Sequence, residues 1–266
     1  MGVADQLPHA LNDPEEFANA LAGRRPAVFL DYDGVLTPIV ERPEDARMSP
    51  EMRDVVRALA DRTPVCVVSG RDRSVVQDLM GVTDLVVAGS HGFDIWHPQR
   101  GTLQHPAASG FEDLVGELTD RLRREVGGLD GVQVEPKHAS VAVHYRRAGS
   151  AARNAVADLV RTLLTERPDE IKVTPGKMVY ELQPKIDWNK GRAVDYLIDT
   201  LGLNRPDLVP VYLGDDVTDE DAFRALRDRG VGVYVGDPTT LDRPTQAHFH
   251  LTTVPEVTRL LASLAL

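Results

Sequence analysis

Three short apolar segments of this chain are each followed within two positions by a polar residue, and this arrangement restricts the fold more than any other feature. Residues 27–30 (AVFL), 65–68 (VCVV) and 209–213 (VPVYL) are too short for helices and rich in valine, so we predict that they form buried strands. Residues 50–62 lie between the first two and have helical apolar spacing. Strands that alternate with helices predict a parallel sheet with helices on its faces.

The same alternation extends this predicted sheet in two separate parts of the chain. Residues 85–88 and 231–235 are further apolar segments with the character of strands, which makes five predicted strands in all. Helical spacing is also present at residues 191–201 and 220–229.

The interval between the two parts has a different pattern. Residues 111–126 and 151–164 have the character of helices, and each is followed by a segment of alternating apolar and polar residues, 132–145 and 171–182. A helix followed by two strands, present twice, predicts a small antiparallel α+β domain. We therefore predict a Rossmann-like α/β core interrupted by an inserted domain, with the core at residues 1–107 and 184–266 and the insertion at residues 108–183.

The composition excludes several classes of function. The 266 residues include 41 acidic and 30 basic side chains, for a formal net charge of −11, whereas proteins that bind nucleic acids need a basic face. The single cysteine, Cys66, excludes an internal disulfide and a multi-cysteine metal site. Residues 1–10 lack a secretory signal, and no apolar segment approaches the ~20 residues of a membrane-spanning helix. We expect a cytoplasmic protein that binds neither nucleic acid nor membranes.

Polar residues follow three of the predicted strands where α/β sheets bind ligands. Asp31 and Asp33 follow the first strand, Ser69 follows the second, and Asp215 and Asp216 follow the fourth. Two carboxylates two positions apart point the same way in an extended chain, and such like charges are unfavourable unless a cation or a proton compensates them. This convergence is harder to obtain by chance than any single motif.

The acidic residues also have simpler interpretations. An aspartate after a strand is often a turn former or a helix cap, and Glu220 and Asp221 fit the acidic first turn of a helix. A calcium-binding loop that begins at Asp31 is excluded, because its fifth and twelfth positions would fall on Val35 and Arg42.

Lys190 has two open interpretations. Asn189 is a predicted N-cap, which places Lys190 in the first turn of a helix, where the helix dipole disfavours a cation by ~0.3–1 kcal/mol. The lysine is either a solvated surface residue or the partner of a bound phosphate.

Taken in order, these motifs resemble the four motifs of haloacid dehalogenase (HAD)-type phosphatases. They are DYDG (31–34), SGR (69–71), Lys190 and GDD (214–216). Further segments are similar to the trehalose-6-phosphate phosphatases within that superfamily: DYDGVLTP (31–38), GSHG (89–92), HYR (144–146), WNKG (188–191) and GDDVTDED (214–221). The similarity extends from about residue 27 to residue 236. Val35 and Gln183 stand where that family commonly has threonine and arginine.

The resemblance implies a Mg²⁺-dependent phosphatase that hydrolyses trehalose 6-phosphate to trehalose and phosphate through an aspartyl-phosphate. Asp31 would be the nucleophile and Asp33 the general acid and base. Ser69 and Lys190 would bind phosphoryl oxygens. The metal residues implied are Asp31, the backbone carbonyl of Asp33, and Asp215, with Asp216 and Asp219 either supporting them or one of these two ligating directly.

The resemblance also implies that the inserted domain is a cap that excludes water and recognises the sugar. The cap residues that match sugar-binding positions are Glu135, Lys137, Arg146, Lys177 and Glu181; the other interpretation is surface salt bridges. In the core, Arg71 and His91 are assigned to the substrate, although Arg71 could instead hold the site in shape and His91 could be a loop histidine.

Two alternative functions remain open at this stage. One is a phosphatase of another glycosyl phosphate, such as glucosylglycerol phosphate or sucrose phosphate. The other is a non-catalytic sugar-phosphate-binding module, against which the presence of Asp31, Asp33, Lys190 and Asp215 argues. Because only short segments lie outside the similarity, we expect the trehalose-6-phosphate synthase to be a separate chain.

Overall fold

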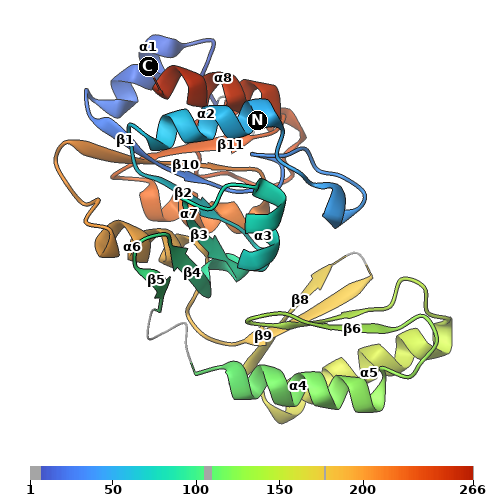
Figure 1. The fold of residues 1–266 in the computed structure, drawn as a ribbon. Helices are drawn as coiled ribbons and strands as arrows, with labels where there is room; N and C mark the ends of the chain where they lie inside the picture. The colour runs from blue at the N-terminus through green and yellow to red at the C-terminus, as the bar shows by residue number, and fades with distance from the viewer. Residues whose placement is uncertain (1–6, 105–109, 177, 266) are drawn as a thin grey trace. The chain divides into compact units, whose positions relative to one another are not determined.

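The computed structural model describes residues 7–104, 110–176 and 178–265 (Figure 1). The chain divides into two compact units, one made of Met1–Leu103 with Trp188–Leu266 and one made of Gln104–Asp187. No helix within the described ranges is both long and apolar enough to cross a membrane. Each unit is described on its own.

The first unit is built around an eight-stranded sheet. Its strands are β1 (Arg25–Leu30), β2 (Val65–Val68), β3 (Val86–Gly89), β4 (Asp94–His97), β5 (Gly101–Leu103), β10 (Leu208–Gly214), β11 (Val231–Val235) and β12 (Phe249–Leu251). They pair in the order β12-β11-β10-β1-β2-β3-β4-β5, parallel from β12 to β3 and antiparallel from β3 to β5. The predicted α/β sheet and its five strands are confirmed. The other three strands, β4 (DIWH), β5 (GTL) and β12 (FHL), contain polar residues or glycine and no continuous apolar segment, which is why apolar patterning did not indicate them.

Helices cover both faces of this sheet. They are α1 (Pro14–Leu21), α2 (Pro50–Ala60), α3 (Arg73–Met80), α6 (Lys190–Thr200), α7 (Glu220–Leu226) and α8 (Val254–Leu264). Helices α2 and α8 lie on one face, and α6 and α7 lie on the other (Figure 1). Short 3₁₀ turns lie in the connecting loops, among them Pro43–Asp45, Ser90–Gly92, Val217–Asp219 and Pro238–Thr240. Helix α7 ends at Leu226, three residues before the predicted end.

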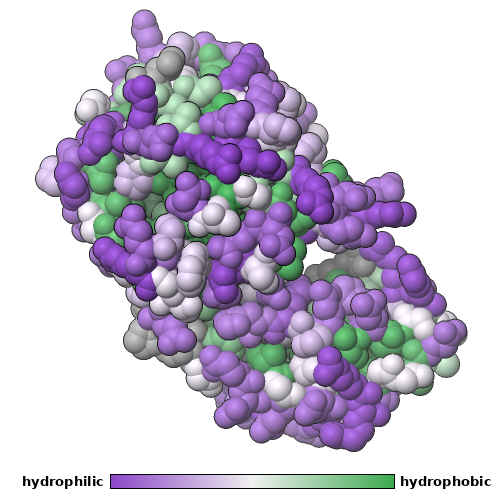
Figure 2. Space-filling view, viewed as in Figure 1, coloured by the Kyte–Doolittle hydropathy of each residue, from purple (hydrophilic) through white to green (hydrophobic). Residues whose placement is uncertain are grey.

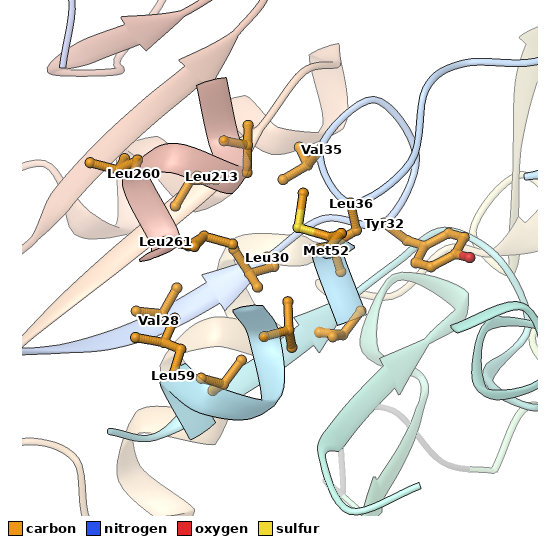
Figure 3. Packing of buried hydrophobic residues seen from close by; sticks show 14 of the residues in the cluster. Val28, Leu30, Tyr32, Val35, Leu36, Met52, Leu59, Leu213, Leu260 and Leu261 are labelled. Atoms are coloured by element: carbon orange, nitrogen blue, oxygen red, sulfur yellow. The ribbon is translucent and has the colours of Figure 1, made fainter. Parts of the chain in front are cut away.

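The first unit has an apolar core between β1 and the helices α2 and α8. Val28 and Leu30 of β1 belong to one buried cluster with Leu59 of α2 and Leu261 of α8 (Figure 3). Full burial of each such side chain stabilises the fold by roughly 1.5–3 kcal/mol. Cys66 in β2 is fully buried as well, and burial raises the pKa of its thiol to about 12, so the thiol is un-ionised at neutral pH.

The connections of the sheet change direction at β1. From β1 the chain continues to β2 and β3 on one side, whereas β10, β11 and β12 follow one another on the other side. Ligands of open α/β sheets bind at the carboxyl ends of the strands where the order reverses in this way. Asp31 follows β1 at this point, and Asp215 follows β10 beside it.

The second unit is a smaller α+β structure. Its elements are α4 (Glu112–Glu125), β6 (Gln133–Pro136), β7 (Val141–His144), α5 (Ser150–Glu166), β8 (Ile171–Gly176) and β9 (Val179–Pro184). The four strands form an antiparallel sheet in the order β6-β7-β9-β8. Apolar residues of both helices pack against Val141, Val143 and Leu182 on one face of this sheet. The predicted pattern of one helix and two strands, present twice, is confirmed.

Hydrophilic side chains cover most of the face of each unit that Figure 2 shows, and hydrophobic residues appear there in small groups. This distribution is typical of a surface in contact with water.

Candidate active site

Asp31 lies at the carboxyl end of β1 and has little freedom to move. Its side chain is nearly fully buried, and Oδ1 accepts the backbone N–H of Tyr32 at 2.7 Å. Oδ2 lies 2.9 Å from Nζ of Lys190. Tyr32 is itself fixed, because its hydroxyl donates to the carbonyl of Ala46 at 2.6 Å. The Asp31 carboxylate is therefore held in one orientation at the switch in strand order.

Lys190 is the first residue of α6, and its side chain is buried rather than solvated. Asn189 caps the helix as predicted, since its side chain accepts the N–H of Arg192 at 2.9 Å. Nζ of Lys190 also donates to Oδ1 of Asp219 at 2.6 Å. Burial by itself lowers the pKa of Lys190, but Asp31 and Asp219 outweigh burial and raise it. Lys190 is thus a permanent cation between two carboxylates.

Asp219 is fully buried and uses both of its oxygens. Oδ1 accepts from Lys190 and from the hydroxyl of Tyr212, at 2.5 Å for the latter. Oδ2 accepts the backbone N–H groups of Asp215 at 3.1 Å and Asp216 at 2.9 Å. Asp219 therefore fixes the loop after β10 and anchors Lys190 at the same time.

Asp215 completes a group of three carboxylates. Oxygen atoms of Asp31, Asp215 and Asp219 all lie within 4.8 Å of one another. Gly34 has a φ of +75° and lies so close that a Cβ at this position would overlap the Asp215 carboxylate, so glycine is required there. Burial, followed by the charges of Asp219 and Asp216, raises the pKa of Asp215 to about 7.

The three carboxylates carry more negative charge than Lys190 can compensate. Burial and the charge of Asp219 raise the pKa of Asp31 well above its ordinary value, although Lys190 opposes this shift. The group would therefore hold protons in the absence of another cation. Carboxylate oxygens are hard ligands of the kind that Mg²⁺ and similar divalent ions prefer. The residues at this site fit a divalent metal ion.

Asp33 has a different partner from Asp31. Both of its oxygens accept hydrogen bonds from Arg71, Oδ2 from Nε at 2.7 Å and Oδ1 from Nη2 at 2.7 Å. Nη1 of the same guanidinium donates to the carbonyl of Pro43 at 2.7 Å. These hydrogen bonds to Asp33 raise the pKa of Arg71. The structure therefore places Arg71 on the second carboxylate and ties that carboxylate to the loop after β1.

His91 lies on a strained turn that follows β3. Ser90 and His91 have φ values of +49° and +57°, which cost roughly 1–3 kcal/mol each in non-glycine residues. The turn is held because the N–H of Ser90 donates to the carbonyl of Arg71 at 2.7 Å and that of His91 to the carbonyl of Ser69 at 2.8 Å. A Cβ on Gly70 would lie 2.7 Å from Cε1 of His91, so the imidazole rests directly on this glycine.

These strand ends surround a cavity of about 540 Å³. The predicted site residues that line it are Asp31, Asp33, Arg71, His91, Lys190, Asp215 and Asp216. Ser69 is fully buried next to it, where its Oγ accepts the N–H of Arg71 at 3.1 Å. Asp216 is exposed and caps its own loop through the N–H of Val217. Asp33 and Asp216 do not belong to the group of three carboxylates among the described residues.

Three of the predicted sugar-binding residues of the second unit, Glu135, Lys137 and Glu181, lie in polar pairs. Oε2 of Glu135 is 2.7 Å from Nε2 of His144. Nζ of Lys137 is 3.4 Å from Oε1 of Glu181, which also accepts the hydroxyl of Ser140 at 2.6 Å. The side chains of both pairs are partly exposed.

The strand register places two of these acids on one face of the second sheet. Glu135 and Glu181 both pair with Ala142, whereas Val141 and Leu182 face the helices. Glu135 and Glu181 therefore lie on the face away from α4 and α5. Arg146 follows β7, and its carbonyl accepts a hydrogen bond from Arg153 at 3.0 Å. Lys177 lies outside the described residues.

Comparison with known proteins identifies the family of this chain. A sequence model of the trehalose-phosphatase family matches residues 29–255. The chain belongs to the trehalose-phosphatase family. A trehalose 6-phosphate phosphatase of Zea mays is 38% identical over 276 residues, which cover 98% of this chain and 75% of that protein. The resemblance inferred from the motifs is therefore confirmed.

Solved structures agree with this membership. The C-terminal domain of the C. albicans trehalose-6-phosphate phosphatase has a TM-score of 0.71 and 26% identity, with 98% of each chain covered. The C-terminal domain of the Candida albicans trehalose synthase regulatory protein has the same fold, with a TM-score of 0.68, 14% identity, and 98% of this chain and 99% of that chain covered.

Sequence reasoning missed two features of this trehalose-phosphatase site. Tyr212 binds Asp219, and the only signal for it was a polar side chain inside the apolar segment 209–213. The fork between Arg71 and Asp33 joins residues 38 positions apart, and the sequence contains no signal for that pairing.

Proposed function

We propose that this protein hydrolyses trehalose 6-phosphate to trehalose and phosphate, as a step of trehalose biosynthesis. The observation that carries the proposal is the buried Asp31 carboxylate, which lies against Lys190 and Asp215 at the strand-order switch of a trehalose-phosphatase-family chain. A cavity that also contains Asp33 opens onto it.

Asp31 would act as the nucleophile. Its carboxylate attacks phosphorus, the bond from phosphorus to the sugar oxygen breaks, and an aspartyl-phosphate forms. The hydrogen bond from Tyr32 and the contact with Lys190 orient the carboxylate for this attack. Water then attacks the phosphorus of the aspartyl-phosphate and restores Asp31.

Asp33 would serve as acid in the first step and as base in the second. The sugar alkoxide is a poor leaving group, so its oxygen needs a proton as the bond breaks. Both Asp33 oxygens accept from Arg71 in the structure, and a proton on Asp33 would replace one of these hydrogen bonds. Once that proton has passed to the sugar, Asp33 is again a carboxylate that accepts a proton from water.

Mg²⁺ is the metal that we propose for the site. Asp31, Asp215 and the backbone carbonyl of Asp33 would hold it, with Asp216 and Asp219 in support. When bound, the ion would neutralise charge on the transferred phosphoryl oxygens and on the acidic group. Asp219 already makes hydrogen bonds to four neighbours, so we assign it mainly to positioning.

The phosphoryl group would also be held by side chains of the first unit. The Lys190 ammonium has three protons, and its contacts with Asp31 and Asp219 leave a donor for a phosphoryl oxygen. We propose that Ser69 and His91 contact the same group or the sugar oxygen beside it.

The second unit, at residues 108–183 in our sequence-based division, would act as the cap that recognises the sugar. Each sugar hydroxyl both donates and accepts, so adjacent acids and bases suit it. The residues that we assign to this role are Glu135, Lys137, Arg146, Lys177 and Glu181. The proposal includes a cytoplasmic location and a synthase on a separate chain.

The test is phosphate release across a panel of sugar phosphates, with Mg²⁺ and with a chelator. We expect trehalose 6-phosphate to have the highest kcat/KM and chelation to stop the reaction. A comparable kcat/KM for sucrose phosphate or glucose 6-phosphate would refute the substrate assignment.

The other candidate from the sequence, a non-catalytic sugar-phosphate-binding module, is disfavoured because Asp31, Asp33, Lys190 and Asp215 all line one cavity. Tight binding of trehalose 6-phosphate without turnover in Mg²⁺ would support that alternative.

A further inference from the structure

Large exposed hydrophobic residues are scarce, and those described lie at one edge of the first unit. They are Ile39, Val40, Val75 and Val217. Ile39 and Val40 follow β1, Val75 lies in the first turn of α3 after β2, and Val217 follows β10. All four positions are therefore at the carboxyl ends of the parallel strands, where the charged site lies.

Ile39 is the extreme case and has a specific location. The residue is 74% exposed, although burial of an isoleucine side chain is worth roughly 1.5–3 kcal/mol. Ile39 and Val40 line the same cavity as Asp31 and Lys190, whereas Val75 and Val217 do not. An exposed apolar surface inside a polar cavity is typical of a ligand contact.

The loop that contains Ile39 and Val40 is tethered to Asp33, the proposed general acid. Asp33 and Thr37 pair as a β-bridge, and Gly34 N–H donates to the carbonyl of Thr37 at 2.8 Å, so the start of the loop is fixed beside Asp33. Arg71 fixes its far side, because the same guanidinium binds Asp33 and the carbonyl of Pro43. Ile39 and Val40 therefore lie between two tethers to the proposed general acid.

This arrangement defines the side of the cavity on which the leaving group lies. Under the proposed function, Asp33 gives its proton to the oxygen that joins phosphorus to the sugar, so the sugar attached to that oxygen lies next to Asp33. A hexose ring has apolar C–H groups as well as hydroxyls. Ile39 and Val40 offer an apolar surface for these C–H groups, whereas the charged residues of the cavity suit the phosphate.

We infer that Ile39 and Val40 form the apolar wall of the leaving-group subsite and help to determine specificity for a sugar over a small leaving group. The inference rests on the proposed phosphatase function and adds the sugar contact on the first unit. It assigns these residues no part in the chemistry of the phosphoryl group.

The test compares Ile39→Ser and Val40→Ser with the wild type on two substrates. Trehalose 6-phosphate has the sugar, whereas acetyl phosphate presents the same phosphoryl group without one. We expect each variant to lose about tenfold in kcat/KM for the sugar phosphate, which corresponds to about 1.4 kcal/mol, mainly through KM. The kcat/KM for acetyl phosphate and the inhibition constant of inorganic phosphate should stay unchanged.

Two further variants make the result specific. Val75→Ser removes an exposed valine from the same edge that does not line the cavity, and should leave both substrates unaffected. Ile39→Leu keeps the apolar surface and should retain most of the activity on the sugar phosphate. Circular dichroism of each variant checks the fold.

An equal loss for the sugar phosphate and for phosphate binding would overturn the inference, because the loop would then act on the phosphoryl site. No loss with Ile39→Ser and Val40→Ser would overturn it as well. If the wild type turns over a different sugar phosphate from the panel, the proposed substrate is wrong, and the same variants are then judged on that sugar phosphate against phosphate inhibition.

Discussion

The two units hold their charged residues in opposite ways. In the first unit, Asp31, Lys190 and Asp219 are almost completely buried, and each is fixed by short hydrogen bonds. In the second unit, the side chains of Lys137 and Glu181 are about a quarter exposed, and their nearest atoms are 3.4 Å apart.

This difference indicates a division of labour. Burying an unpaired charge destabilises a fold by several kcal/mol. A network of paired buried charges is therefore expected where catalysis needs charges held in fixed positions. Partly exposed pairs contribute little to stability and can exchange their partners for ligand hydroxyls. We therefore propose that phosphoryl chemistry belongs to the first unit and that sugar selection belongs mainly to the second.

The largest effect that would test this division is the loss of the nucleophile. Asp31→Asn removes the group that attacks phosphorus and should lower kcat by roughly 10⁴- to 10⁶-fold on every substrate. Phosphate release measures it, and Asp61→Asn, the same change at an exposed helix end, should leave the rate unaltered. Substantial turnover by Asp31→Asn would contradict the assignment of Asp31 as the nucleophile.

The second prediction is that removing a charged residue destabilises the protein more in the first unit than in the second. Asp219→Ala leaves Lys190 and two backbone N–H groups short of an acceptor in the interior, so we expect the free energy of unfolding to fall by about 3–5 kcal/mol. His144→Ala breaks the exposed pair with Glu135 and should cost less than about 1 kcal/mol. Urea unfolding of both variants provides the measurement, and similar losses would contradict the division.

Substrate selectivity, in contrast, should depend on the charged residues of the second unit. Lys137→Ala should reduce kcat/KM for trehalose 6-phosphate by roughly 10- to 100-fold, because a charged hydrogen bond to the sugar is lost, while acetyl phosphate is turned over as before. Lys185, which pairs with Asp169 at 3.6 Å in the second unit, is the matched control as Lys185→Ala. A parallel loss on acetyl phosphate would place Lys137 in the chemistry instead.

The smallest effect is a dependence of metal binding on pH. The pKa of Asp215 in the folded protein, about 7, lies above its ordinary 3.8, so between these values the metal-free fold holds a proton that the unfolded chain releases. Its contribution to stability is therefore present at low pH and is lost as pH rises toward 7.

Bound Mg²⁺ should counteract this loss of stability as pH rises. Because the ion must displace the proton, its affinity should fall by about tenfold per pH unit below 7, and its effect on Tm should grow as pH rises. Thermal unfolding with and without Mg²⁺ between pH 5.5 and pH 8 checks this. A Tm increase that does not vary with pH would show that Asp215 is ionised before the ion binds.

The sequence predicted the parts of the site that are local in the chain. The strand before Asp31 and the cap formed by Asn189 both follow from patterns within a few residues, and the structure has both. The position of Asp215 beside Asp31 followed from a general property of parallel sheets. The roles of these residues came from the family resemblance rather than from spacing.

Pairings across long separations could not be predicted in this way. Arg71 with Asp33, and Tyr212 with Asp219 opposite Lys190, depend on side-chain directions that only the assembled sheet sets. The exposure of Ile39 was hidden for the same reason, since an isoleucine after a strand looks like a core residue in the sequence.

The central claim is that the phosphoryl group passes through Asp31, and trapping tests it most directly. Asp33→Asn cannot activate water, but acetate leaves without an acid, so acetyl phosphate should load Asp31 and the intermediate should accumulate. After rapid quenching and borohydride reduction, peptide mass spectrometry should find homoserine at position 31. Phosphate release with an unmodified Asp31, or homoserine at another position, would contradict the account.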